Sequence, residues 1–267
     1  MTPARLLGPA CLLGIVNATP DSFSDGGRSK LESVDHAMRL AAEGADMLDV
    51  GGESTRPGAA PVEEQAELDR VLPVIEALCA RTPVPLSIDT RKPAVAAAAV
   101  AAGASVWNDV SALTYAADSL ATAARLGVPV VLMHAQGDPQ TMQDAPAYKD
   151  VVAEVLSFLH ARIGAARGAG VASLVADPGI GFGKTLTHNL SLMRGLERFA
   201  DLGVPLMMGA SRKRFIAALD RDGPAHERVG GSLAAALRAR QAGFAWFRVH
   251  DVAQTRQALA VWDAASR

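Results

Sequence analysis

The chain has 267 residues, of which 49% are hydrophobic and 20% are charged, a balance typical of a globular protein with a core. Its formal net charge of -2 and its 4% of aromatic residues argue against binding to nucleic acid or to an anionic membrane surface. No apolar run approaches the roughly 20 residues of a membrane-spanning helix, so we expect no membrane association.

Cysteine usage and the N-terminal segment bear on the compartment. Cys11 and Cys79 are too few for a disulfide framework, and we expect both to be reduced, packed thiols. The apolar stretch at residues 10–16 is too short and too interrupted by glycine for a signal peptide. These features predict a cytoplasmic protein.

One pattern repeats along the chain: a short apolar run, a polar turn rich in glycine, and an amphipathic stretch rich in alanine. The eight apolar runs predict strands at Leu12–Asn17, Met47–Gly51, Leu86–Asp89, Ser105–Asp109, Val130–His134, Leu174–Asp177, Leu206–Gly209 and Ala245–Val249. Between them, apolar residues recur three and four positions apart, for example over residues 34–42, 68–78 and 151–163, which predicts helices. We expect left-handed helix ends at Gly44, Gly103, Gly127, Gly203 and Gly243.

These elements favour one α/β architecture. Short apolar runs without alternation suit strands that are buried on both faces of a parallel sheet. Eight strand–helix units in about 250 residues match a (β/α)8 TIM barrel, here a single domain over residues 1–267 with its site at the carboxyl ends of the strands. An open doubly wound sheet is the alternative, although no GxGxxG follows the first run to support its dinucleotide-binding form.

Polar or ionisable residues end every predicted strand. In a closed barrel these residues converge on one mouth, where active sites of this fold lie. Helix capping explains single cases such as Asp251 or Thr90, but it does not explain all eight strands. The last two strands carry Ser211, Arg212, Lys213, Arg248 and His250, which predict a phosphate or pyrophosphate site. Surface salt bridges are the alternative for this basic cluster.

The middle strands place acceptors and an amide at the mouth, namely Asp49, Asp89, Asn108, Asp109 and Asp177. Buried carboxylates need donor partners, and a heterocycle with an amino-amide edge supplies them. A metal site is the alternative. No zinc-ligand spacing is present, whereas Mg²⁺ held by substrate phosphates and one or two oxygen ligands fits better. The glycine-rich loops after the first two strands, with Asp25 and Arg56 near their tips, are either mobile lids or ordinary packed loops.

Several blocks of the sequence form a recognisable series. Three of them are long: residues 14–27, 49–58 and 177–184. The shorter blocks are residues 87–90, 107–109, 133–134, 209–213 and 248–252. In content and order these blocks resemble those of the dihydropteroate synthases, and the resemblance covers nearly the whole chain. It implies a transferase that condenses 6-hydroxymethyl-7,8-dihydropterin pyrophosphate with p-aminobenzoate in folate biosynthesis.

The resemblance also implies roles for individual residues. Pyrophosphate is bound by Asn17, Arg248 and His250, with Asn17 as the ligand of a Mg²⁺ cofactor. The pterin is held by Asp89, Asn108, Met133, Asp177, Gly209 and Lys213. p-Aminobenzoate is surrounded by Phe23, Thr55, Pro57, Phe182 and Ser211, with Lys213 close by. The catalytic residues are Asp25, Arg56, Asp89 and Lys213. The resemblance further implies a homodimer through residues 232–241 and 252–264.

Two positions depart from the commonest family pattern, Ala135 after His134 and Arg214 after Lys213, which puts the rim of the aminobenzoate site in question. Two other functions remain open. A pterin-binding methyltransferase domain shares the barrel, but such domains lack the two long loops and the Ser-Arg-Lys block that this chain has. A paralogue that binds pterin without turnover is disfavoured by the intact Asn17 and Arg56.

Overall fold

The computed structural model describes residues 9–18, 30–54, 58–138 and 140–266. The described strands are β1 (Cys11–Asn17), β2 (Met47–Gly51), β3 (Leu86–Asp89), β4 (Val106–Asp109), β5 (Val130–Met133), β6 (Leu174–Asp177), β7 (Met207–Met208) and β8 (Trp246–Val249). The described α-helices are α1 (Lys30–Ala42), α2 (Glu64–Cys79), α3 (Pro93–Ala101), α4 (Ser119–Leu126), α5 (Val151–Gly168), α6 (Leu186–Arg194), α7 (Arg214–Leu219), α8 (Val229–Gln241) and α9 (Val252–Ala265). The described residues also form the 3₁₀ helices η2 (Leu196–Leu202) and η3 (Ala225–Arg228).

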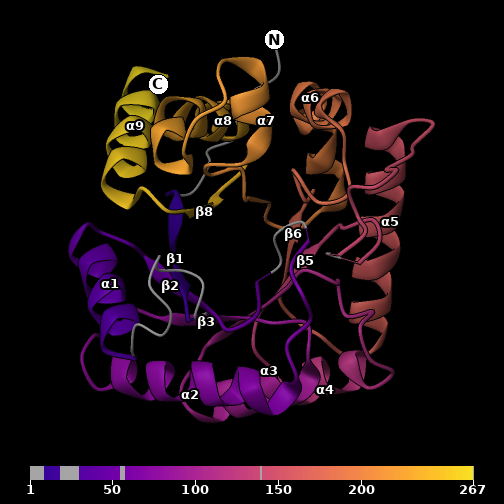
Figure 1. Cartoon of the computed structure of the whole chain (residues 1–267). Coiled ribbons are helices and arrows are strands. Elements are labelled where there is room, and N and C mark those ends of the chain that lie inside the picture. The colour runs from indigo at the N-terminus through magenta and orange to yellow at the C-terminus, as the bar shows by residue number, and fades with distance from the viewer. Residues whose placement is uncertain (1–8, 19–29, 55–57, 139, 267) are drawn as a thin grey trace.

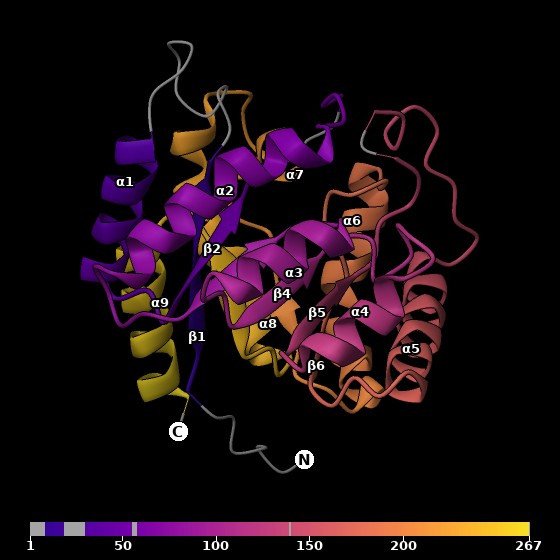
Figure 2. The same cartoon turned by 90° about the horizontal axis from the view of Figure 1, so that it is seen from below.

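The strands form one parallel sheet in the order β6-β5-β4-β3-β2-β1-β8-β7. A single bridge between Ala176 of β6 and Leu206, just before β7, joins the two ends of this sheet. The helices surround the strands as an outer ring (Figure 1). Seen from below, α2, α3 and α4 lie outside the strands on one side (Figure 2). The (β/α)8 barrel is therefore confirmed, and the open doubly wound sheet is excluded.

The predicted strand ranges hold at β2, β3 and β6 and shift at the other strands. Cys11 begins β1, whereas Ser105, His134 and Ala245 lie outside β4, β5 and β8. The largest difference is at β7, which keeps two of the four predicted residues because Leu206 makes only the isolated bridge to β6. The prediction of Leu206–Gly209 was therefore too long, since apolar character does not report how many ladder hydrogen bonds a segment makes.

The apolar residues pack in two separate layers. Most of them fill the space between the strands and the surrounding helices, with Trp107, Phe199, Phe244 and Phe247 among the fully buried side chains. A smaller layer plugs the barrel itself and consists of Leu13, Met47, Val106, Val131, Val175 and Met207. This plug closes the amino end of the barrel, so the interior is open for chemistry only toward the carboxyl ends of the strands.

Helix ends follow the glycine pattern that the sequence predicts. The five predicted glycines have φ between 65° and 118°, in the left-handed region that favours glycine: Gly44, Gly103, Gly127, Gly203 and Gly243. The prediction of two packed thiols is wrong for Cys79, which is exposed because it is the last residue of α2, while Cys11 is half-buried. Within the described ranges, no helix has the length and apolar character needed to cross a membrane.

Candidate active site

Inward-pointing side chains change from apolar to polar along the strands. The plug residues Met47, Val106 and Val175 are followed two positions later by Asp49, Asn108 and Asp177. Side chains of a strand alternate between its two faces, so a residue two positions further on points into the same barrel, closer to the mouth. The same step leads to Met133 on β5, Gly209 after β7 and Arg248 on β8. The barrel register therefore brings the predicted pterin residues together.

Arg248 connects three strands at the mouth. Its Nε donates to Asp49 Oδ2 at 2.6 Å, and its Nη2 donates to Asp89 Oδ2 at 2.6 Å. Asn108 Nδ2 also donates to Asp49 Oδ2, at 3.1 Å. One oxygen of each carboxylate, Oδ1, is buried without a hydrogen-bond partner. A buried acceptor without a partner is costly, so these two oxygens are suited to receive donors from a ligand.

Two carboxyl groups at the mouth, those of Asp89 and Asp177, have raised pKa values. Burial raises the pKa of Asp89 to about 7, partly opposed by Arg248 and reinforced by the neighbouring Asp49 and Glu67. Burial also raises the pKa of Asp177, partly opposed by Lys213. Asp177 Oδ1 accepts a hydrogen bond from the Gly179 N–H at 2.6 Å. Strongly shifted carboxyl groups gathered in one concave site are typical of ligand-binding and catalytic centres.

Lys213 lies beside Asp177 and at the edge of the β6–α6 loop. Its ammonium donates to the Ile180 carbonyl and lies 4.3 Å from the centre of the Phe182 ring. Burial lowers the pKa of Lys213 to about 8, with Asp177 opposing the shift. A Cβ at Gly209 would stand 3.2 Å from Asp177 Oδ2 and 4.0 Å from Lys213 Nζ. Glycine at position 209 therefore leaves space in front of both charged groups.

The basic cluster after β7 and β8 divides into two pairs. Ser211 Oγ lies 3.0 Å from His250 Nδ1, and it also accepts from the His250 N–H at 3.2 Å. Arg212 instead pairs with Asp251, through bonds of 3.0 and 2.5 Å. The structure thus brings Ser211 and His250 together at the mouth, whereas the guanidinium of Arg212 is engaged in a salt bridge.

The base of the β2–α2 loop is held by a buried ion network that the sequence reasoning missed. Lys92 Nζ bridges Glu53 Oε2 at 2.7 Å and Glu67 Oε2 at 2.6 Å. Glu53 Oε1 accepts from the Val62 N–H at 3.1 Å and from Arg91 Nη2 at 3.1 Å. The available signal was the placement of Glu53 two residues after β2 and of Lys92 directly before α3.

The remaining predicted residues lie at the end of β1 or outside the described residues. Asn17 ends β1 at the mouth and is half-buried. Five predicted residues lie outside the described residues: Phe23, Asp25, Thr55, Arg56 and Pro57. In the part of the chain that the structure describes, no group of three His, Cys, Asp or Glu side chains is placed to hold a metal ion.

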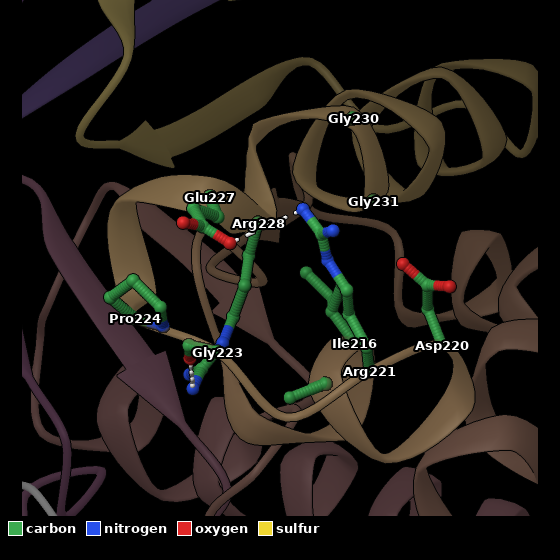
Figure 3. Close-up of a pocket in the computed structure, with 10 residues that line it drawn as sticks. Ile216, Asp220, Arg221, Gly223, Pro224, Glu227, Arg228, Gly230 and Gly231 are labelled. Atoms are coloured by element: carbon green, nitrogen blue, oxygen red, sulfur yellow. Dashed lines mark hydrogen bonds and ion pairs between the residues drawn. The ribbon is translucent and has the colours of Figure 1, made fainter.

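Two cavities lie near the carboxyl side of the fold. One, of about 120 Å³, adjoins the mouth; Phe182 and Ala135 are among the residues that line it. Another, of about 130 Å³, lies between α7, η3 and α8 and is lined by Ile216, Arg221, Glu227 and Arg228 (Figure 3). It contains none of the predicted site residues, so convergence of polar groups, and not cavity size, locates the candidate site.

The two positions that depart from the family pattern both lie at the rim. Ala135 is half-buried in the wall of the cavity beside Phe182. Arg214 is exposed as the first residue of α7. Neither residue enters the cluster of Asp89, Asn108 and Asp177.

Comparisons with known proteins agree with this geometry. Residues 13–250 match the family model described as "Pterin binding enzyme". The dihydropteroate synthase of Escherichia coli K12 is 48% identical over 257 residues, covering 95% of this chain and 90% of that protein. The chain belongs to the dihydropteroate synthase family.

Solved structures of the family share the fold closely. A dihydropteroate synthase of Xanthomonas albilineans with 4-aminobenzoic acid has a TM-score of 0.91 and 53% identity, covering 97% of this chain and 93% of that one. The same species' enzyme in complex with 7,8-dihydropteroate has a TM-score of 0.88 and 50% identity, covering 98% and 95%. The predicted family and the predicted enzyme class, a transferase, are therefore confirmed.

Proposed function

We propose that this chain joins 6-hydroxymethyl-7,8-dihydropterin pyrophosphate to p-aminobenzoate, which gives 7,8-dihydropteroate and pyrophosphate. The convergence of Asp89, Asn108, Asp177 and Lys213 on one mouth carries this proposal. Family membership supports it, as do the 4-aminobenzoic acid and the 7,8-dihydropteroate in the two related structures.

The pterin is proposed to lie across the carboxyl ends of β3, β4 and β6. Its amino and ring N–H groups suit the acceptors Asp89 and Asp177, and Asn108 can both donate and accept. Lys213 donates to the ring carbonyl or nitrogen. Met133 supplies an apolar contact and Gly209 leaves room for the ring.

The proposed reaction breaks the bond between the pterin methylene carbon and the pyrophosphate oxygen, and the leaving group takes the electron pair. Positive charge then spreads over the pterin ring, where Asp89 and Asp177 stabilise it. The lone pair of the neutral aniline nitrogen forms the new carbon–nitrogen bond, and that nitrogen releases a proton. No covalent enzyme intermediate is needed, so positioning and exclusion of water supply much of the acceleration.

Asn17, Arg248 and His250 are proposed to bind the pyrophosphate, and two nitrogens of Arg248 already hold Asp49 and Asp89. The amide oxygen of Asn17 is the type of hard donor that Mg²⁺ prefers, and pyrophosphate oxygens would provide further ligands. When bound, Mg²⁺ would offset the negative charge of the leaving group. Asn17 is the single protein ligand in this proposal.

p-Aminobenzoate is proposed to lie between Phe182 and Ser211, next to Lys213. The resemblance adds Phe23, Thr55 and Pro57 to this subsite, and it assigns Asp25 and Arg56 to the two loops after β1 and β2. These five residues lie outside the described part of the chain, so the proposal for them rests on the sequence alone.

A coupled assay tests the proposal. Purified protein is supplied with the pterin pyrophosphate, p-aminobenzoate and Mg²⁺, while pyrophosphate and dihydropteroate are measured. Product that depends on each component supports the proposal. Pterin binding without product contradicts it and favours a binding paralogue or a methyltransferase domain, which a corrinoid methyl-transfer test would separate.

We also propose a homodimer through α8 and α9. Ala260, Val261 and Ala264 are exposed together on α9 and support an apolar contact on this side. Light scattering after size-exclusion chromatography tests it, and a monomer at micromolar concentration contradicts it. The cytoplasmic location stays a prediction.

A further inference from the structure

Every backbone carbonyl of residues 179–184, in the loop between β6 and α6, accepts a hydrogen bond from a side chain. In order along the segment, the donors are Lys184, Lys213, Gln143, Lys184 again, Tyr148 and Asn189. Gly179, Gly181 and Gly183 have φ of 66°, 84° and 60°. These left-handed residues turn successive carbonyls to different sides, so that the segment can surround a donor.

Lys184 is that donor, and its ammonium is buried within the loop. It donates to the carbonyls of Gly179 at 2.8 Å, Phe182 at 2.9 Å and His134 at 3.3 Å. It also lies 2.9 Å from His134 Nδ1. Burial, with a further contribution from Lys184, lowers the pKa of His134 to about 3, so the ring is neutral and Nδ1 accepts from the ammonium.

The charge of Lys184 is balanced by dipoles instead of a carboxylate. Among the described residues no carboxylate oxygen lies within 4.0 Å of Nζ. Burial and the charge of Lys213 lower the pKa of Lys184 well below its usual value. An apolar side chain would avoid this cost but would leave three buried carbonyls without a donor. Three carbonyls and His134 Nδ1 surround the one nitrogen, which suits an ammonium with three N–H donors better than a neutral amine with two.

The loop that Lys184 fixes makes three contacts with the candidate site. The Gly179 N–H donates to Asp177 at 2.6 Å, the Ile180 carbonyl accepts from Lys213, and the Phe182 ring lies 4.3 Å from the Lys213 ammonium. Lys184 itself is 3% exposed, and its ammonium is enclosed by acceptors of His134, Gly179 and Phe182. It therefore affects the site only through the backbone of the loop and through its charge.

We propose that Lys184 is a positioning residue: its buried ammonium fixes the β6–α6 loop in one shape and thereby sets Lys213 and Phe182 for the two substrates. The inference rests on the proposed function, because it assigns the affected contacts to the pterin and to the arylamine. Lys184 would thus influence the binding of both substrates without contacting either of them.

The test replaces the ammonium by an apolar chain of similar length, Lys184→Met. In this variant Phe182 loses its fixed backbone and Lys213 loses the fixed Ile180 carbonyl that its ammonium binds. KM for both substrates therefore rises about tenfold or more, since small misplacements of positioning groups have large kinetic effects. The exposed Lys149→Met is the matched control and leaves both KM values unchanged. A Lys184→Met enzyme with normal KM values overturns the proposal.

A second readout separates positioning from mere stability. Burial lowers the pKa of Lys213, whose ammonium is held against the loop by the Ile180 carbonyl. A loosened loop exposes this ammonium to water, so Lys184→Met raises the pKa of Lys213. The ¹³Cε shift of Lys213 reports this pKa without turnover, so it remains informative if the wild-type protein makes no dihydropteroate. A lower melting temperature with an unchanged Lys213 titration overturns the proposal.

Two further variants apply if Lys184→Met fails to fold. Tyr148→Phe removes only the donor to the Gly183 carbonyl. As with Lys184→Met, both KM values are expected to rise, here by about two- to threefold. In Lys184→Ala, ammonium chloride is expected to lower KM again, whereas sodium chloride at equal ionic strength is not. Absence of both effects contradicts a cation-dependent loop.

Discussion

Asp89→Asn offers a test in which stability and function change in opposite directions. The substitution keeps the shape of the side chain but removes a charge that the fold holds at a cost. Asp89 is 7% exposed, lies near Asp49, and has one oxygen with no hydrogen-bond partner. We therefore expect the variant to be more stable than the wild type at alkaline pH and to bind pterin poorly.

The size of the effect follows from the raised pKa. A shift of the Asp89 pKa from 3.8 to about 7, at roughly 1.36 kcal/mol per unit, corresponds to about 4 kcal/mol. The native state holds the proton more tightly than the unfolded chain, so this stability is present below about pH 4 and is lost as the pH rises through about 7. The amide cannot ionise, but it makes a weaker bond to Arg248. We therefore expect about half of the 4 kcal/mol, roughly 2 kcal/mol, as the net gain.

Thermal unfolding of both proteins between pH 4 and pH 8.5 measures this difference. The variant should melt about 5 °C higher than the wild type at pH 8, and the gap should close toward pH 4. The pyrophosphate-release assay should show at least about a hundredfold lower kcat/KM, given the loss of a charged hydrogen bond. A difference in melting temperature that does not depend on pH, or full turnover by the variant, refutes the reasoning.

Three other predictions follow from buried contacts. Lys92→Met leaves Glu53 and Glu67 without their buried cation and should destabilise the fold by about 3–5 kcal/mol in urea titrations; an unchanged midpoint contradicts this. Gly179→Ala would bring a Cβ to 1.8 Å from the His134 carbonyl oxygen at a φ of +66°, so circular dichroism should show little folded protein. A normal melting curve of this variant contradicts the close approach of Gly179 to His134. The Lys213 ammonium loses its proton as the pH rises through about 8, so kcat/KM should fall above that pH, and a profile flat to about pH 10 disproves this role.

Much of the fold follows from the order of apolar runs and glycine-rich turns, because eight short strands buried on both faces have few other arrangements. The length of β7 does not follow from it. Leu206 and Gly209 are as apolar or small as their neighbours, yet only Met207 and Met208 pair with β8 as a strand. The first and last residues of such a strand depend on backbone pairing with distant segments, which local composition does not predict.

The candidate site was predictable to the level of residues but not of contacts. A period of two along the strands places Asp49, Asn108 and Asp177 above the apolar plug, and this pattern was present in the sequence. The pairing of Arg248 with Asp49 and Asp89 was not, because it joins residues 199 and 159 positions apart. Lys184 was visible only as the end of a conspicuous glycine-rich block, since its role depends on where three carbonyls point.

The single bridge between Ala176 and Leu206 gives the barrel a seam, and the seam runs between Asp177 and the segment that leads to Lys213. Seven strand pairs share ladders, whereas this junction depends mainly on side chains and on one backbone contact. A pterin that contacts both Asp177 and Lys213 connects the β6 side of this seam with the β7 side. Ligand binding then completes the wall of the barrel, and amide exchange in β6 and β7 should slow more than in β2 and β3 when the site is filled.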